Sequence, residues 1–278
     1  MISLVRAAGL AVAAGMVAGA AQAQQGAFTY APGTQRYRVT TVVDRTQDQA
    51  GGRAPFEFVV TTTQYVTLNL ARGSHDTLNM ILTVDSVGVN STLDALPPDT
   101  EGFRGVKLQG KISPRGRLYA FDPPSGTPPG KLTALYRAFR LFLVAFPDTR
   151  IATGMTWTDS ATDILNRDPF KITSVRTVNW KVTSDTTVVG QQAWRVEGDG
   201  SVTMSGDGKQ NGTPIQLTGD ESIRSVRFFS KGGTYLGGNA TQNSQIQMSM
   251  AETGEGAPIR QMIRSTVEPL MGARTAAQ

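Results

Sequence analysis

Apolar side chains recur at every second position along much of this chain, and that spacing constrains its fold more than any other feature. Tyr37, Val39, Thr41 and Val43 fall on one side of an extended segment, and the alternating residues of 78–84 repeat the pattern. Successive side chains of a β-strand point to opposite faces, so a period of two gathers the apolar residues on one face. The sequence therefore predicts a mainly β protein.

Residues that favour turns separate these segments. Glycine, asparagine and aspartate tolerate positive φ, and they occur at Asp185, Gly190, Asp207-Gly208, Asn211-Gly212 and Gly232-Gly233. The predicted strands are 37–43, 56–70, 78–84, 106–112, 118–121, 172–182, 188–196, 202–204, 215–229, 235–236, 246–250 and 259–267. Their spacing is typical of an all-β domain, and we expect about 10 to 12 strands.

One segment departs from the period of two. After a proline-rich stretch, apolar residues fall at Leu132, Leu135, Tyr136, Phe139, Phe142, Leu143 and Phe146. Spacings of three and four place them on one stripe of an α-helix, and Pro147 would end that helix because the residue before proline avoids helical angles. The pattern predicts an amphipathic helix at 131–146, with its second half apolar nearly all round and buried against the sheet.

The first 23 residues have the order of an export signal. Arg6 precedes an alanine-rich apolar run and the sequence Ala21-Gln22-Ala23, a small-x-small site of the kind that export peptidases cut. The run is about 15 residues long, shorter than the roughly 20 that a membrane-spanning helix needs. We expect a signal peptide at 1–23, a single antiparallel β domain at 24–268 containing the helix, and a flexible C-terminal tail at 269–278. The mature chain is then periplasmic or extracellular, without a transmembrane segment.

Composition argues against several classes of function. The chain has no cysteine and one histidine, so ligands for zinc and other transition metals are scarce. Its net charge of +5 is spread along the chain without a basic block, which argues against nucleic acid as a partner.

His75 lies between Ser74 and Asp76, but neighbours in an extended segment point apart, so a polar turn is expected rather than a hydrolase triad. Lysine replaces a calcium ligand in 207–212, which favours a solvated turn there. No catalytic residue, metal or cofactor is predicted, and we do not expect an enzyme.

The order of several short motifs resembles an uncharacterised group of exported bacterial proteins. The motifs are Lys111-Ile112-Ser113-Pro114-Arg115-Gly116, the helix, Phe146-Pro147, Gly154-x-Thr156-Trp157, Gly190 ahead of Ala193-Trp194-Arg195-Val196, and Gly232-Gly233-Thr234-Tyr235. That group is similar in architecture to the periplasmic lipoprotein-carrier class, in which a curved antiparallel sheet wraps helices and can open an apolar cavity. The resemblance implies a large curved antiparallel sheet, or incomplete β-barrel, packed on the amphipathic helix. This chain departs from the carriers in having one predicted helix instead of several, which leaves a lid without support.

The leading hypothesis is a non-enzymatic cell-envelope protein that binds a lipid or other apolar ligand between the sheet and the helix. The candidate ligand-binding residues are Leu135, Tyr136, Phe139, Phe142, Leu143, Phe146, Trp157 and Trp180. Apolar and aromatic side chains of this kind line ligand pockets, but they would equally complete a closed core. A second hypothesis is an envelope interaction or assembly module that binds a protein partner through strand edges and has no small-molecule ligand. A third, a transmembrane β-barrel, is disfavoured by the central helix, by 7% aromatic residues and by a C-terminus without an aromatic strand.

Overall fold

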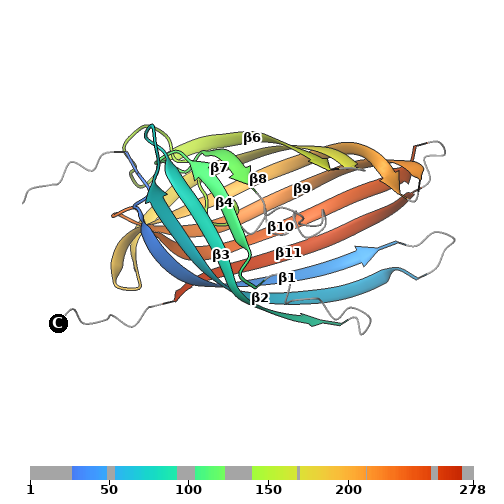
Figure 1. Cartoon of the computed structure of the whole chain (residues 1–278), viewed down its shortest axis with the longest axis horizontal. Helices are drawn as coiled ribbons and strands as arrows, with labels where there is room; N and C mark the ends of the chain where they lie inside the picture. The colour runs from blue at the N-terminus through green and yellow to red at the C-terminus, as the bar shows by residue number, and fades with distance from the viewer. Residues whose placement is uncertain are drawn as a thin grey trace, which may run out of the picture.

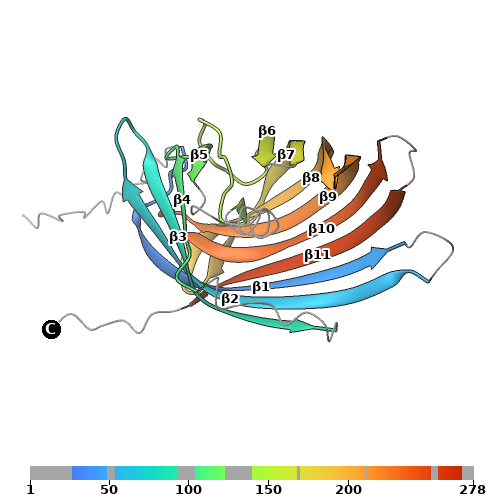
Figure 2. The ribbon, with the colours of Figure 1, turned by 45° about the vertical axis from the view of Figure 1, so that its right-hand side comes forward.

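The computed structural model is one antiparallel sheet of eleven strands, curved into a trough (Figures 1 and 2). It describes residues 27–48, 54–92, 104–122, 140–167, 170–210, 212–251 and 256–270. The strands are β1 (Gly33–Gln47), β2 (Phe56–Arg72), β3 (Leu78–Ser91), β4 (Lys107–Ile112), β5 (Leu118–Asp122), β6 (Thr156–Arg167), β7 (Phe170–Val188), β8 (Gln191–Gln210), β9 (Thr213–Ser230), β10 (Tyr235–Met250) and β11 (Gly256–Leu270). Among the described residues, no helix is long and apolar enough to cross a membrane.

The sheet consists of two meanders joined side by side. Strands β1 to β5 form one meander and β6 to β11 the other, and the pairing of β1 with β11 unites them. The order across the sheet is β5-β4-β3-β2-β1-β11-β10-β9-β8-β7-β6, so β5 and β6 are its edges and do not pair with each other. Figure 2 shows these two edges on opposite sides of the open trough. The prediction of a large curved antiparallel sheet with about 10 to 12 strands is confirmed.

The strand predictions fail mainly where polar or glycine residues interrupt the alternation. The predicted strand at 188–196 spans the last residue of β7, the turn at 189–190 and the start of β8. The one at 202–204 is also part of β8, and those at 235–236 and 246–250 are parts of β10. The predicted turns at Asp185 and Asp207-Gly208 lie inside β7 and β8. In contrast, Gly190, Gly212 and Gly233 do adopt positive φ, as a tight turn requires. Strand β11 continues to Leu270, two residues past the predicted domain boundary.

The predicted helix at 131–146 is not supported by the part of it that the structure describes. Arg140 alone is helical, and the chain is a turn and then irregular backbone up to Phe146, while 131–139 lie outside the described residues. Backbone groups in this stretch bond to other elements instead of to the helix: the Val144 N–H donates to the Tyr30 hydroxyl at 2.9 Å, and the Phe146 N–H donates to the Arg115 carbonyl at 2.9 Å. Tertiary contacts of this kind override helical periodicity.

Residues 142–146, which we call the inserted segment, lie on the inner side of the curved sheet and complete a packed core at one end of it. The Arg227 guanidinium donates to the Leu143 carbonyl at 2.5 Å, and the Trp157 indole N–H donates to the Ala145 carbonyl at 2.8 Å. The core around this segment includes Phe28, Tyr30, Tyr37, Val39, Val66, Leu82, Leu108, Trp180, Val196, Phe229 and Tyr235, each at most 4% exposed. The inserted segment therefore fills the trough at this end.

Two glycines in β8 allow the sheet to curl around the core. A Cβ on Gly198 would clash with the Trp180 ring and lie 2.9 Å from the Ser225 hydroxyl, and one on Gly200 would clash with the Thr177 carbonyl. Glycine inside a strand often marks such a close approach. The bare backbone of β8 thus lets the Trp180 ring lie across the floor of the trough.

Candidate ligand-binding face

The inner side of the sheet continues beyond the packed core. Tyr37 and Val39 point into that core, so Val43, Arg45 and Gln47 of the same strand point to the same side. Cross-strand pairing extends this face to both sides; for example, Val43 is opposite Val60 on β2 and Ile263 on β11. We call this surface the distal face. It comprises Val43, Arg45, Gln47, Phe56, Phe58, Val60, Ile172, Ser174, Arg176, Val202, Met204, Ile215, Leu217, Glu221, Ile223, Gln242, Ser244, Ile246, Met248, Ile259, Gln261 and Ile263.

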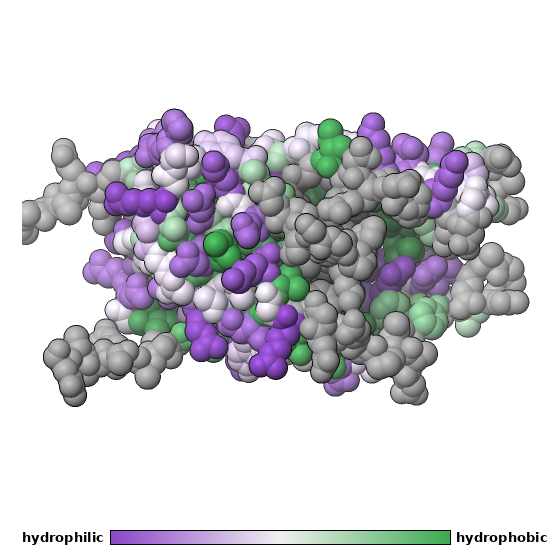
Figure 3. Space-filling model, viewed as in Figure 1, coloured by the Kyte–Doolittle hydropathy of each residue, from purple (hydrophilic) through white to green (hydrophobic). Residues whose placement is uncertain are grey.

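Most side chains of the distal face are apolar and retain some solvent exposure. Phe56 is 41% exposed, and its ring centroid lies 5.6 Å from that of Phe58, which is half-buried. Leu217, Ile246 and Met248 are also half-buried, whereas the four isoleucines of β9 and β11 are buried. The space-filling view shows hydrophobic residues in the recess toward the free ends of the long strands (Figure 3). An apolar surface of this kind can bury an apolar chain.

The outward-facing residues of the same strands are mostly polar, with exceptions such as Val175 and Met262. Along β9, exposed positions alternate with inward ones, and the outward side chains Gln216, Thr218, Asp220, Ser222 and Arg224 are exposed. The sheet therefore has an apolar inner side and a hydrophilic outer side, which is the order expected of a sheet whose outer face contacts water.

A row of polar side chains crosses the distal face. Its polar members, in order across the sheet, are Arg45, Gln261, Ser244, Glu221 and Arg176, with Val202 between the last two and Phe58 beside Arg45. The Ser244 hydroxyl donates to the Glu221 carboxylate at 2.9 Å and accepts from the Gln261 amide at 3.5 Å. Ser244 and Glu221 are buried. This polar row lies between apolar residues on either side and gives the distal face a defined place for a polar group.

The arginines at the two ends of this row have different partners. Arg176 donates to Asp159 at 2.7 Å, with both side chains less than a fifth exposed. Arg45 donates only to the side-chain amide oxygen of Gln47, at 3.2 Å, and its guanidinium carbon lies 5.7 Å from the centre of the Phe58 ring. The structure thus neutralises Arg176 with a carboxylate of its own chain but provides none for Arg45 within the described residues.

The predicted site residues that the structure describes lie in the packed core rather than on the distal face. Phe142, Leu143, Phe146 and Trp180 are at most 7% exposed, and Trp157 packs against this cluster with its ring centroid 5.4 Å from that of Phe146. Leu135, Tyr136 and Phe139 lie outside the described residues. The structure therefore brings five predicted residues together, in positions where they complete a core.

Ionisable groups of this core are strongly perturbed by burial. Burial raises the pKa of Tyr30 and Tyr37 well above the usual range and raises that of Tyr235 to about 12. Burial also lowers the pKa of Arg227. The Tyr37 hydroxyl donates to the Tyr235 carbonyl at 2.8 Å. The Tyr30 hydroxyl accepts from the Val144 N–H at 2.9 Å, so the groups of Tyr30, Tyr37 and Arg227 are all bonded to the protein itself. Their role is structural.

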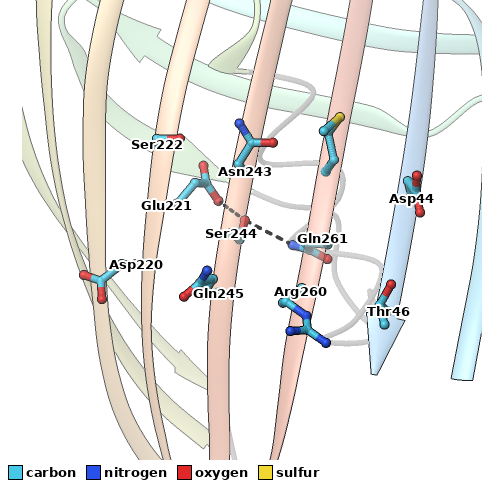
Figure 4. Close-up of a pocket in the computed structure, with 11 residues that line it drawn as sticks. Asp44, Thr46, Asp220, Glu221, Ser222, Asn243, Ser244, Gln245, Arg260 and Gln261 are labelled. Atoms are coloured by element: carbon cyan, nitrogen blue, oxygen red, sulfur yellow. Dashed lines mark hydrogen bonds between the residues drawn. The ribbon is translucent and has the colours of Figure 1, made fainter. Parts of the chain in front are cut away.

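An open depression of about 580 Å³ lies behind the polar row, on the outward face of the sheet (Figure 4). Its outward-facing lining consists of Asp44, Thr46, Asp220, Ser222, Asn243, Gln245, Arg260 and Met262, and the inward-facing Glu221, Ser244 and Gln261 complete it. All lining residues except Met262 are polar or charged types, and the depression is wide open. It does not have the enclosed form typical of a small-molecule pocket.

No protein-family model matches the chain, and no curated protein matches its sequence. Among solved structures, it is similar to lipovitellin, in a structure titled for lipid–protein interactions, with 13% identity and a TM-score of 0.47 over 90% of this chain and 26% of that one. It thus spans about a quarter of the lipovitellin chain. It is also similar to Neisserial surface protein A, with 9% identity and a TM-score of 0.24 over 86% of this chain and 99% of that one. It is also similar to OccK2 of Pseudomonas aeruginosa, with 7% identity and a TM-score of 0.30 over 86% of this chain and 98% of that one. These identities and TM-scores are too low to transfer any property of those proteins to this chain.

Proposed function

We propose that this protein is a non-enzymatic component of the cell envelope that binds a lipid or another molecule with an apolar chain on its distal face. The observation that carries the proposal is the continuation of apolar, partly exposed side chains along the inner side of the sheet beyond the packed core. The ligand surface proposed here differs from the one predicted from sequence, because Phe142, Phe146 and Trp180 are already enclosed by protein.

The energetics favour an apolar chain over a compact polar ligand. Each methylene group that moves from water to an apolar surface contributes roughly 0.8 kcal/mol, so a long acyl chain gains several kcal/mol before the cost of immobilising it. Leu217, Ile246 and Met248 lie on neighbouring strands and provide continuous apolar contact for such a chain. The mostly polar outer face supports contact of that face with water. A sheet that spans a membrane needs the opposite arrangement, with apolar residues outside and polar residues inside.

A probe-binding assay on the full mature chain tests the proposal. Wild-type protein should bind a fluorescent fatty-acid probe, and Leu217→Gln should weaken that binding because it places an amide on the distal face. Thr218→Gln is the matched control, since Thr218 is the next residue of β9 and is exposed on the outward face. Absence of probe binding to delipidated wild type, or an equal effect of both variants, would reject the distal face as a ligand site.

A protein partner at a strand edge is the second candidate function. Strand β6 ends the sheet, and Ile164 on it is 65% exposed while Val175 on β7 is 45% exposed. An edge strand with exposed apolar side chains can accept a strand from another protein. Under this alternative, Ile164→Lys should abolish recovery of a co-purified envelope protein and leave probe binding unchanged. Loss of the partner in Leu217→Gln but not in Ile164→Lys would argue against the edge.

A further inference from the structure

We propose that Arg45 binds the anionic head group of the ligand, so that the site selects amphiphiles with a carboxylate or phosphate head over neutral ones. This inference rests on the proposed function, because it assumes that the apolar part of the ligand lies on the distal face. It adds the chemical class of the head group and the residue that recognises it.

Arg45 is set among side chains that shield it without neutralising it. On one side it is opposite Phe58 of β2, and on the other it is opposite Gln261 of β11. Its Nε atom is buried and has no hydrogen-bond partner in the described part of the protein, which is also true of the Arg176 Nε, but Arg45 lacks the carboxylate partner that Arg176 has. Its one hydrogen bond goes to an uncharged amide oxygen of Gln47. This guanidinium has fewer acceptors than N–H donors. A partly buried charge is costly unless it is paired and hydrogen-bonded, so an added acceptor would stabilise it.

Two other inward-facing arginines, Arg176 and Arg227, have strong partners within the protein. Arg176 is paired with the carboxylate of Asp159. Arg227 donates to the carbonyl oxygen of Leu143 in the inserted segment and stacks over the Trp180 ring at 5.1 Å. Arg45 has the aromatic neighbour, but its one hydrogen bond, to Gln47, is longer at 3.2 Å, and it has no carboxylate partner within the described residues. An external anion would bind at the N–H donors of Arg45 that have no partner within the protein.

The chemistry of the surrounding residues favours an oxyanion that is attached to an apolar chain. A guanidinium presents a planar set of N–H donors that matches the two oxygens of a carboxylate or phosphate. The amides of Gln47 and Gln261 flank it, and Phe58 lies directly opposite it. Its diagonal neighbours across the strands are also apolar: Phe56, Val60, Ile259 and Ile263. A head group at Arg45 would therefore leave its chain against apolar side chains, whereas a free inorganic anion would leave these surfaces uncovered.

The test compares ligands that differ only in the head group. Hexadecanoate, hexadecyl phosphate and hexadecanol would each be used to displace the fluorescent fatty-acid probe from wild type, Arg45→Met and Arg45→Lys. Inorganic phosphate provides the free anion. We expect Arg45→Met to weaken binding of both anionic compounds by about 10- to 100-fold, the range for losing a charge-assisted hydrogen bond, with little effect on hexadecanol. Arg45→Lys should retain part of the preference, because it keeps the charge but loses the planar donor set.

Arg264→Met is the matched control, since Arg264 lies on the outward face of the neighbouring strand and is exposed. Far-ultraviolet circular dichroism of each variant establishes that the sheet is retained. Equal affinity for hexadecanol and hexadecanoate in wild type, unchanged in Arg45→Met, overturns the role of Arg45 and leaves the proposed function standing. No binding of any long-chain compound overturns the proposed function itself. Displacement by inorganic phosphate as effective as that by hexadecyl phosphate overturns the requirement for a chain.

Discussion

Replacing Phe142 by alanine separates the packed core from the distal face. The Phe142 side chain is 1% exposed, and its ring packs against Tyr37 at 5.1 Å and Tyr235 at 5.6 Å between ring centroids. Removing a buried phenylalanine costs about 3 to 5 kcal/mol through lost burial and the cavity left behind. For a domain of this size, each kcal/mol lowers the melting temperature by roughly 2 to 4 °C, so Phe142→Ala should melt about 6 to 20 °C lower.

Phe56→Ala is the corresponding change on the distal face. Because Phe56 is 41% exposed, its removal should cost only about 1 to 2 kcal/mol. The assay is thermal and denaturant unfolding of delipidated protein, followed by circular dichroism, together with probe affinity at a temperature where both variants are folded. We expect Phe142→Ala to lose mainly stability and Phe56→Ala to lose mainly affinity. A loss below about 1 kcal/mol for Phe142→Ala, or equal losses for both variants, would refute the division into a packed core and a binding face.

Two further outcomes follow from the interior of the trough. Gly198→Ala should lower the free energy of unfolding by about 1 to 3 kcal/mol, because its methyl group meets the Trp180 ring. Adding Trp180→Phe should recover part of this loss, measured by denaturant unfolding, whereas additive losses would contradict the steric account. The pKa of Tyr235 is raised to about 12 by burial, and those of Tyr30 and Tyr37 are raised too, whereas an unfolded tyrosine ionises near pH 10. Stability should thus be unchanged below about pH 10 and should fall as the pH rises to about 12, so tyrosinate absorbance and loss of the sheet signal should appear together.

The strands could be predicted wherever one face of the sheet is uniformly apolar. Tyr37 and Val39 alternate with polar residues because they face the packed core, and that pattern is visible in sequence. The middle of β10 was missed because its inward residues include Gln242 and Ser244, which are polar and belong to the distal face rather than to the packed core. The gap predicted within β8 falls at Gly198 and Gly200, which are poor strand formers but leave room for residues of β7. Propensity describes each segment alone, whereas pairing on both sides fixes these two strands.

Within the described residues 141–146, the helix prediction was wrong for a related reason. A segment that is apolar nearly all round must be buried, but apolar content does not distinguish a buried helix from an irregular chain surrounded by a sheet. Contacts far apart in sequence, such as Tyr30 with Val144 and Arg227 with Leu143, decide between them. The distal face was missed because its residues come from seven strands, and only the register between those strands places Arg45 beside Phe58 and Gln261.

The inserted segment itself shows what the trough can hold. In the packed half, an irregular stretch of the chain's own backbone lies inside the curve, with apolar side chains against the sheet and its carbonyl at Leu143 bonded to the inward-facing Arg227. The distal half has the same two features: apolar side chains around Phe58 and an inward-facing arginine at Arg45. The difference is one of strength: Arg227 donates to the Leu143 carbonyl at 2.5 Å, whereas Arg45 donates to the Gln47 side-chain oxygen at 3.2 Å. The Arg45 Nε also has no hydrogen-bond partner within the described residues. A ligand with an apolar chain and an oxygen-bearing head would therefore make, in the distal half, the same two kinds of contact that the protein makes with itself in the packed half.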